Sequence, residues 1–276
     1  MPNVPDAATR ATPQTTTPAV TIHTPLGAWS IEAAWVGKPD AQRVTVLLHE
    51  GLGSVAMWKD FPQQLARATA SRVLVYSRPG YGQSTPRPAE LRWTPRFMHE
   101  QAQVVLPAVL DALDIKAPVH LIGHSDGGSI ALLAAAHLPQ RVASCVVMAP
   151  HTHVEAISIQ SIETAKRAFE APNSKLRASL SRYHTDVDSA FYGWNDVWLS
   201  PSFRDWTIEA ETASIRCPLL AIQGVDDEYG TLAQIHGIQT RTPHAQLLEL
   251  PDCGHSPHRD QPQALLAAIS GFAHQP

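Results

Sequence analysis

The chain has 276 residues, of which 44% are hydrophobic, so it is long enough to bury a substantial core. Its formal net charge of −4 provides no basic surplus for phosphate backbones, and nucleic acid is therefore not an expected partner. The cysteines Cys145, Cys217 and Cys253 lie far apart without C-x-x-C spacing, and we expect them to be reduced.

The N-terminal segment is rich in Thr, Pro and Ala, a composition that predicts a disordered tail over residues 1–18. It contains no continuous apolar stretch that could act as the core of a signal peptide. No run in the chain approaches the roughly 18 apolar residues of a membrane span. We therefore expect a cytoplasmic protein without a membrane partner.

Apolar runs of strand length then alternate with helical patterns, which is typical of an α/β protein with a mostly parallel sheet. Residues 20–23 and 30–35 flank a turn-forming segment, and we expect them to form an antiparallel hairpin. Six later runs are short and apolar, as parallel strands covered on both faces tend to be. These runs are residues 44–48, 73–76, 119–122, 142–148, 219–222 and 246–250.

Helical patterns fill most of the intervals between these runs. Residues 98–113 carry apolar side chains on one face and predict a helix that Pro107 kinks rather than abolishes. The interval 151–213 departs from this alternation, because it is long and predicts several short helices joined by turns. We expect it to form a cap on a core built from residues 19–150 and 214–276.

The strongest local signal is the pentapeptide from Gly123 to Gly127, a G-x-S-x-G with Ser125 at its centre. It lies between an apolar run and the helical pattern of residues 129–138, which predicts a serine on a tight strand-to-helix turn. The following helix would point its N-terminal N–H groups at developing negative charge. The pattern favours a nucleophile at Ser125 over a glycine-rich turn without chemistry.

A serine hydroxyl is a weak nucleophile and needs an adjacent base that is itself held by an acid. Asp226 and Asp227 follow the run 219–222, and His255 follows the run 246–250. Both places are ends of predicted parallel strands, the edge where open α/β sheets bind their ligands. The chain order of serine, aspartate and histidine fits a triad, and either aspartate could belong to it.

With these residues the chain resembles the α/β-hydrolase superfamily, from about residue 20 to the C-terminus. The resemblance implies a mostly parallel, eight-stranded sheet flanked by helices, with a helical cap insertion. In that family the acid commonly follows a glycine by three residues, which favours Asp227 after Gly224 over Asp226. The catalytic histidine usually follows a glycine directly, as His255 does.

The same resemblance implies an oxyanion hole made of two backbone N–H groups. One belongs to the residue after the nucleophile, here Asp126. The other comes from the loop at residues 49–54, which resembles H-G-x-G and favours Leu52, with Gly51 as the alternative. Glu50 interrupts the family pattern, so its carboxylate could contact substrate, tune a histidine or face solvent. We assign a structural role to the family-like loop at residues 77–84.

Aromatic residues gather in the interval 151–213, which favours an apolar or aromatic substrate even though many must pack the cap itself. The residues that we expect to contact substrate are Glu50, His124, His151, His153, Trp194 and Trp198. The spacing of His151, His153 and Glu155 also suits a metal site, but rim positions or helix caps explain it more simply. We predict no metal and no cofactor.

The complete set of residues favours hydrolysis of a carboxylic ester, or a related acyl compound, through an acyl-enzyme. The capped layout also resembles hydrolases that cleave carbon–carbon bonds in ring-fission products of aromatic catabolism. A ligand-binding protein and a cofactor-free oxygenase or lyase on the same scaffold remain open alternatives. The expected partner is a small-molecule substrate, and a homodimer is left open.

Overall fold

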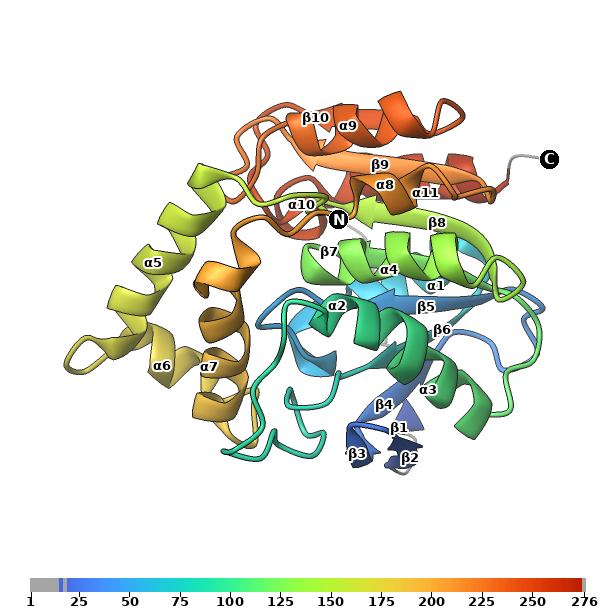
Figure 1. Ribbon diagram of the computed structural model, residues 1–276. Coiled ribbons are helices and arrows are strands. Elements are labelled where there is room, and N and C mark those ends of the chain that lie inside the picture. Colours follow the sequence, from blue (N-terminus) through green and yellow to red (C-terminus); the bar gives the residue numbers. More distant parts are fainter. Residues whose placement is uncertain (1–14, 17–18, 275–276) are drawn as a thin grey trace, which may run out of the picture.

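The computed structural model describes residues 15–16 and 19–274 (Figure 1). The strands are β1 (Thr15–Thr16), β2 (Val20–Thr24), β3 (Gly27–Ile31), β4 (Ala33–Val36), β5 (Val44–Leu48), β6 (Arg72–Tyr76), β7 (Val119–His124), β8 (Val142–Met148), β9 (Leu219–Gly224) and β10 (Gln246–Leu250). The α-helices are α1 (Phe61–Thr69), α2 (Phe97–Glu100), α3 (Leu106–Ala112), α4 (Asp126–His137), α5 (Ala156–Glu170), α6 (Lys175–Leu180), α7 (Val187–Trp198), α8 (Glu209–Thr212), α9 (Ala233–Arg241), α10 (Pro257–Asp260) and α11 (Pro262–Ala273). Two 3₁₀ segments, η1 (Val55–Trp58) and η3 (Pro201–Phe203), and a π-helical segment, η2 (Gln101–Val105), complete the list.

Eight strands of the described chain form one sheet, in the order β1-β4-β6-β5-β7-β8-β9-β10. The strands from β6 across to β10 all run parallel, whereas β4 is antiparallel to β6 and β1 is antiparallel to β4. All six predicted parallel strands are present. The predicted α/β class with a mostly parallel sheet is therefore confirmed.

The N-terminal part differs from the expectation in two respects. Most of the tail predicted over residues 1–18 lies outside the described residues, but Thr15 and Thr16 pair with β4. The segment 30–35 was expected to be one strand of a hairpin, and it divides at Glu32 into β3, which pairs with β2, and β4, which joins the main sheet. The Glu32 carboxylate accepts hydrogen bonds from Ser77 Oγ and Gln83 N–H, and these distant partners hold the division.

Alternating residues of β5 show how the sheet separates two layers of core. Val46 and Leu48 belong to a buried cluster under α4, α9 and the segment from α2 to α3. Leu47 belongs to a second cluster under α1 and α11. Figure 1 shows the corresponding helices on both faces of the sheet. Burial on both sides explains why β5 is mostly apolar.

The helix expected over residues 98–113 is present as α2, the π-helical turn η2 and α3, which follow one another without a break. Pro107 lies in the first turn of α3 and has no N–H to donate to the preceding turn. The wider turn of η2 precedes it, where a π-helical segment can absorb the lost hydrogen bond. The proline therefore alters the helix without ending it.

The interval between β8 and β9 contains α5, α6, α7, η3 and α8. It is helical, but α5 with 15 residues and α7 with 12 are longer than the short helices expected. Figure 1 shows α5, α6 and α7 beyond the edge toward which the β8 and β9 arrows point. At this edge β5, β7, β9 and β10 all end, and the loops that follow them face the cap. Among the described residues, no helix is long and apolar enough to cross a membrane.

Candidate active site

The turn between β7 and α4 holds Ser125 in a strained backbone conformation, with φ at 53° and ψ at −121°. Such a conformation is rare for a residue with a side chain and is typical of functional turns. The close approach of neighbouring backbone explains the flanking glycines. A Cβ at Gly123 would lie 2.1 Å from Gly127 O, and one at Gly127 would lie 2.1 Å from Leu48 O. The motif thus builds a compact elbow that presents Ser125 at the edge of the sheet.

Ser125, His255 and Asp227 form a continuous hydrogen-bonded chain. Ser125 Oγ lies 2.9 Å from His255 Nε2, and His255 Nδ1 lies 2.8 Å from Asp227 Oδ1. Because the carboxylate accepts, Nδ1 carries the imidazole proton and Nε2 is free to accept the serine proton. All three residues are buried. The geometry suits a base-activated nucleophile with an oriented base.

The adjacent aspartates differ in their surroundings. Asp227 Oδ1 also accepts hydrogen bonds from Tyr229 N–H and Gly230 N–H, and Asp227 Oδ2 accepts one from Gln223 Nε2. Asp226 is exposed, and its backbone N–H rather than its side chain takes part in the loop. The structure therefore brings Asp227 to His255.

Asp227 and His255 each favour the charged form of the other, and this opposes the effect of burial on their pKa values. Burial lowers the pKa of His255, but the hydrogen bond and charge of Asp227 outweigh it and raise this pKa above its ordinary value. Burial raises the pKa of Asp227, but the bond from His255 leaves it below its ordinary value. Burial also lowers the pKa of His124 to about 4, of His151 to about 3 and of His258 to about 2. Burial thus keeps these three imidazoles neutral, whereas the pKa of His255 is raised because Asp227 accepts its hydrogen bond.

The two predicted oxyanion donors line the same cavity as Ser125. Leu52, in the loop after β5, and Asp126, at the start of α4, both line the cavity that contains the nucleophile. Asp126 belongs to the first turn of its helix, where N–H groups have no partner within the helix. Gly51, the alternative donor, lines the same cavity. The arrangement leaves the choice between Leu52 and Gly51 open.

The cavity beside Ser125 has a volume of about 120 Å³ and lies between the core loops and the cap. Of the residues predicted to contact substrate, Glu50, His151, Trp194 and Trp198 line it. Sequence analysis missed four further lining residues, Ile162, Glu228, Tyr229 and Ser256. Three of these lie within two residues after Asp227 or His255 along the chain, which is a signal that could have identified them. Nothing in the sequence around Ile162 does so.

His124 and His153, also predicted to contact substrate, are not among the residues that line this cavity. His124 is buried behind the triad, where its Nε2 donates a hydrogen bond to His255 O at 2.6 Å. It therefore supports the loop that carries the base. His124 is the last residue of β7 and lines a separate, smaller pocket together with Glu50, so its predicted contact with substrate stays a prediction.

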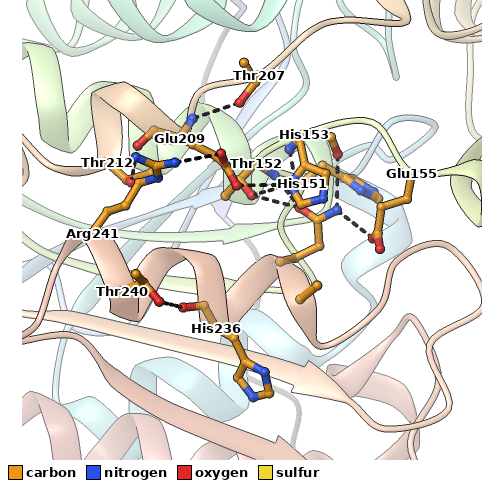
Figure 2. Close-up of polar contacts among 12 residues, drawn as sticks. His151, Thr152, His153, Glu155, Thr207, Glu209, Thr212, His236, Thr240 and Arg241 are labelled. Carbon is orange, nitrogen blue, oxygen red and sulfur yellow. Dashed lines mark hydrogen bonds and ion pairs between the residues drawn. The ribbon is translucent and has the colours of Figure 1, made fainter.

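His153 lies where the chain leaves the core for the cap. Its Nδ1 lies 3.5 Å from Glu209 Oε1, and Glu209 also pairs with Arg241 at 3.0 Å (Figure 2). Glu155 instead accepts hydrogen bonds from Thr231 and from a side chain of α9. Because Glu155 is bound elsewhere, the spacing of His151, His153 and Glu155 does not bring three metal ligands together. Within the described residues, no group of three His, Cys, Asp or Glu side chains is placed to hold a metal ion.

Most aromatic residues of the cap pack against one another. The Phe169 and Phe191 rings are stacked with centroids 3.7 Å apart, and the Phe203 ring lies 5.0 Å from Trp206. Only a minority of the cap aromatic residues therefore reach the cavity. Most aromatic residues of the cap therefore stabilise its packing and do not line the cavity.

A buried polar cluster connects the cap to the elbow. Trp198 Nε1 donates to Asp126 Oδ1 at 3.1 Å, and Arg78 Nη2 lies 3.8 Å from Asp126 Oδ2. Burial raises the pKa of Asp126 to about 6, although the charge of Arg78 opposes this. The loop at residues 77–84 thus contributes a charged side chain next to the nucleophile's neighbour. The sequence of this loop predicts a structural role but does not indicate the contact with Asp126.

Comparisons with known proteins agree with this architecture. A family model described as "Alpha/beta hydrolase family" matches residues 45–269. The chain is 27% identical over 256 residues to the "Putative carbamate hydrolase RutD" of Caulobacter sp. (strain K31), which covers 86% of this chain and 92% of that one. It is 24% identical over 241 residues to a 2-hydroxy-6-oxononadienedioate/2-hydroxy-6-oxononatrienedioate hydrolase of Comamonas testosteroni, with 76% and 80% covered. A solved esterase structure from Thermogutta terrifontis shares the fold, with a TM-score of 0.74, 18% identity, and 94% of this chain and all of that chain covered.

Proposed function

The chain belongs to the alpha/beta hydrolase family, and on this premise we propose that it is a serine hydrolase that cleaves a carboxylic ester or related acyl compound through an acyl-enzyme. Ser125 is the nucleophile, His255 the general base and Asp227 the acid that orients it. The N–H groups of Asp126 and Leu52 bind the tetrahedral oxyanion. The observation that carries the proposal is the hydrogen-bonded chain from Ser125 through His255 to Asp227.

The reaction follows from these positions. His255 Nε2 takes the proton of Ser125 Oγ as the oxygen attacks the carbonyl carbon, and the imidazolium then gives that proton to the leaving group. Asp227 stabilises the imidazolium without being protonated itself. A water molecule repeats the sequence on the acyl-enzyme, which releases the acid and restores the hydroxyl of Ser125.

The cavity supports a compact acyl group. Its volume of about 120 Å³ is below the roughly 300–1,000 Å³ of pockets for drug-sized ligands. Trp194, Trp198 and Ile162 supply apolar surface, and Glu50 and Glu228 supply carboxylates. We therefore expect short acyl chains to be preferred over long ones.

Cleavage of a carbon–carbon bond is the second candidate, favoured by the similarity to the Comamonas testosteroni hydrolase, whose named substrates are dicarboxylates. The lining of the cavity disfavours it. Glu50 and Glu228 are lining residues, and among the described lining residues there is no Lys or Arg. A carboxylate-bearing substrate would therefore meet like charge from Glu228 and from Glu50, whose charge Arg259 Nη2, 3.8 Å from Glu50 Oε1, offsets in part.

A substrate panel tests the proposal. It compares nitrophenyl acetate, butyrate and decanoate with a lactone and a ring-fission dienoate, each with wild-type protein and with Ser125→Ala. We expect acetate and butyrate to give the highest kcat/KM and Ser125→Ala to be inactive. Faster turnover of the dienoate than of every ester would favour the carbon–carbon hydrolase. Binding without turnover of any substrate would favour a binding protein.

A further inference from the structure

His184 lies in the cap between α6 and α7, and its side chain reaches back to two loops of the core. Gly82 N–H donates a hydrogen bond to His184 Nδ1 at 2.9 Å. His184 Nε2 donates one to Leu52 O at 3.0 Å. The residue is buried, with only 5% of its surface exposed. One imidazole therefore connects the cap, the loop after β6 and the loop after β5.

The two partners determine the protonation state of the ring. An amide N–H can only donate and a carbonyl oxygen can only accept, so Nδ1 is the acceptor and Nε2 carries the proton. His184 is thus a neutral imidazole in a single tautomer. Burial lowers the pKa of His184, in agreement with this assignment.

Leu52 is a proposed oxyanion donor, so the direction of its backbone N–H matters for the reaction. It lies in the tight turn closed by the hydrogen bond from Gly53 N–H to Glu50 O, and it lines the cavity beside Ser125. Its N–H has no hydrogen-bond acceptor among the described residues. Its carbonyl is the group that His184 binds.

The core itself holds the beginning of this turn. His49 Nδ1 donates to Glu50 O at 2.6 Å, and Arg78 Nη2 donates to the same oxygen at 2.7 Å. Arg78 N–H donates to His49 Nε2. The first half of the turn is therefore fixed by core residues, whereas its second half is fixed from the cap by His184.

The position of His184 depends in turn on docking of the cap. Thr185 N–H donates to Gly82 O at 2.8 Å, so two neighbouring cap residues exchange hydrogen bonds with one core residue. The Tyr81 ring lies edge-on to both His49 and His184, with centroids 5.4 and 6.2 Å away. The ring contacts leave the imidazole little freedom to rotate.

We propose that His184 is a positioning residue that couples cap docking to the oxyanion loop, by fixing the Leu52 carbonyl and with it the direction of the Leu52 N–H. The inference rests on the proposed function, because it concerns the geometry of the same oxyanion hole. A donor displaced by a fraction of an ångström stabilises the transition state less while leaving substrate binding nearly unchanged.

Two substitutions separate the two hydrogen bonds. His184→Asn places an amide oxygen near the position of Nδ1, so it can accept from Gly82 but cannot reach Leu52. His184→Gln places an amide NH₂ near the position of Nε2, so it can donate to Leu52 but loses the bond from Gly82. Both variants remove the ring, so both lose similar packing. Only the Asn variant loses the proposed coupling.

We expect His184→Asn to reduce kcat on a short ester by about 10- to 100-fold, with KM changed by less than about twofold. The affinity for butylboronic acid, whose adduct with Ser125 is tetrahedral, should fall by the same factor. His184→Gln should keep kcat and boronate affinity within about threefold of wild type. His120→Asn, which removes a half-buried imidazole at the opposite end of β7, controls for a general loss of stability.

Asn and Gln variants with the same kcat, or a boronate affinity that does not follow kcat, would overturn the role of His184 while the wild-type protein still hydrolyses esters. A folded wild-type protein that hydrolyses no ester and binds no boronate would overturn the proposed function and this inference with it.

Discussion

At the scale of single residues, the contacts of two adjacent carboxylates distinguish their roles. Asp227 receives hydrogen bonds from His255, from two backbone N–H groups and from Gln223, so both of its oxygens are held. Asp226 is exposed on the same loop. A carboxylate held in this way can fix the imidazole tautomer and stabilise the imidazolium.

Asp227→Asn should therefore reduce kcat by about 10³ to 10⁴, because the amide cannot accept from Nδ1–H in the same way and favours the wrong tautomer. Asp226→Asn is the matched control and should retain kcat within about threefold. Steady-state kinetics on a short ester, with circular dichroism to verify folding, measure both. A larger loss in Asp226→Asn would show that the wrong aspartate has been assigned.

The pH dependence of kcat/KM follows from the raised pKa of His255. The base must be neutral to accept the serine proton, so activity is lost as pH falls through this pKa, and the acid limb should lie above the ordinary histidine value of about 6.5. Asp227→Asn removes the group that raises the pKa, so its residual activity should show the limb at lower pH. An unmoved limb would assign it to another group, such as Asp126, whose pKa burial raises to about 6.

At the scale of elements, the strand-to-helix turn and the docked cap place the reacting groups. The turn depends on close approach of backbone at Gly127, and the cap depends on contacts such as that from Trp198 to Asp126. The sequence predicted the turn well because its requirements are local. It did not predict the Trp198 contact, because that contact joins residues 72 positions apart.

Gly127→Ala should destabilise the protein by about 1–3 kcal/mol and reduce activity, because the new Cβ would meet Leu48 O. Gly271→Ala is the control, since a Cβ there meets nothing within 4 Å and lies on the helix α11. It should stabilise by about 0.5–1 kcal/mol through helix propensity. Denaturant unfolding measures both, and equal stability changes would contradict the assigned geometry of the turn.

Trp198→Phe keeps an aromatic ring but removes the indole N–H that donates to Asp126. The buried carboxylate then loses its hydrogen-bond donor, and we expect a loss of about 1–3 kcal/mol in the free energy of unfolding. Trp206→Phe is the matched control, because Trp206 Nε1 is buried without a hydrogen-bond partner among the described residues. Its loss should be clearly smaller, and a reversed order would argue against a connection between cap and elbow at Trp198.

At the scale of the whole molecule, one sheet edge brings together groups that the chain holds far apart. The sequence predicted the six parallel strands, the elbow and the order of Ser125, Asp227 and His255, because parallel strands end at a common edge. It could not predict the division at Glu32 or the bond from His184 to Leu52. Both depend on contacts across more than forty residues. Periodicity describes one segment at a time and contains no information about such pairs.

The proposed reaction requires that Ser125 is an activated nucleophile. Reaction of the folded protein with a fluorophosphonate, followed by mass spectrometry of its peptides, measures this without knowledge of the substrate. We predict one adduct, located on Ser125 and lost in Ser125→Ala. Labelling of Ser125→Ala at the wild-type rate, or a folded wild-type protein that is not labelled, would contradict the central claim.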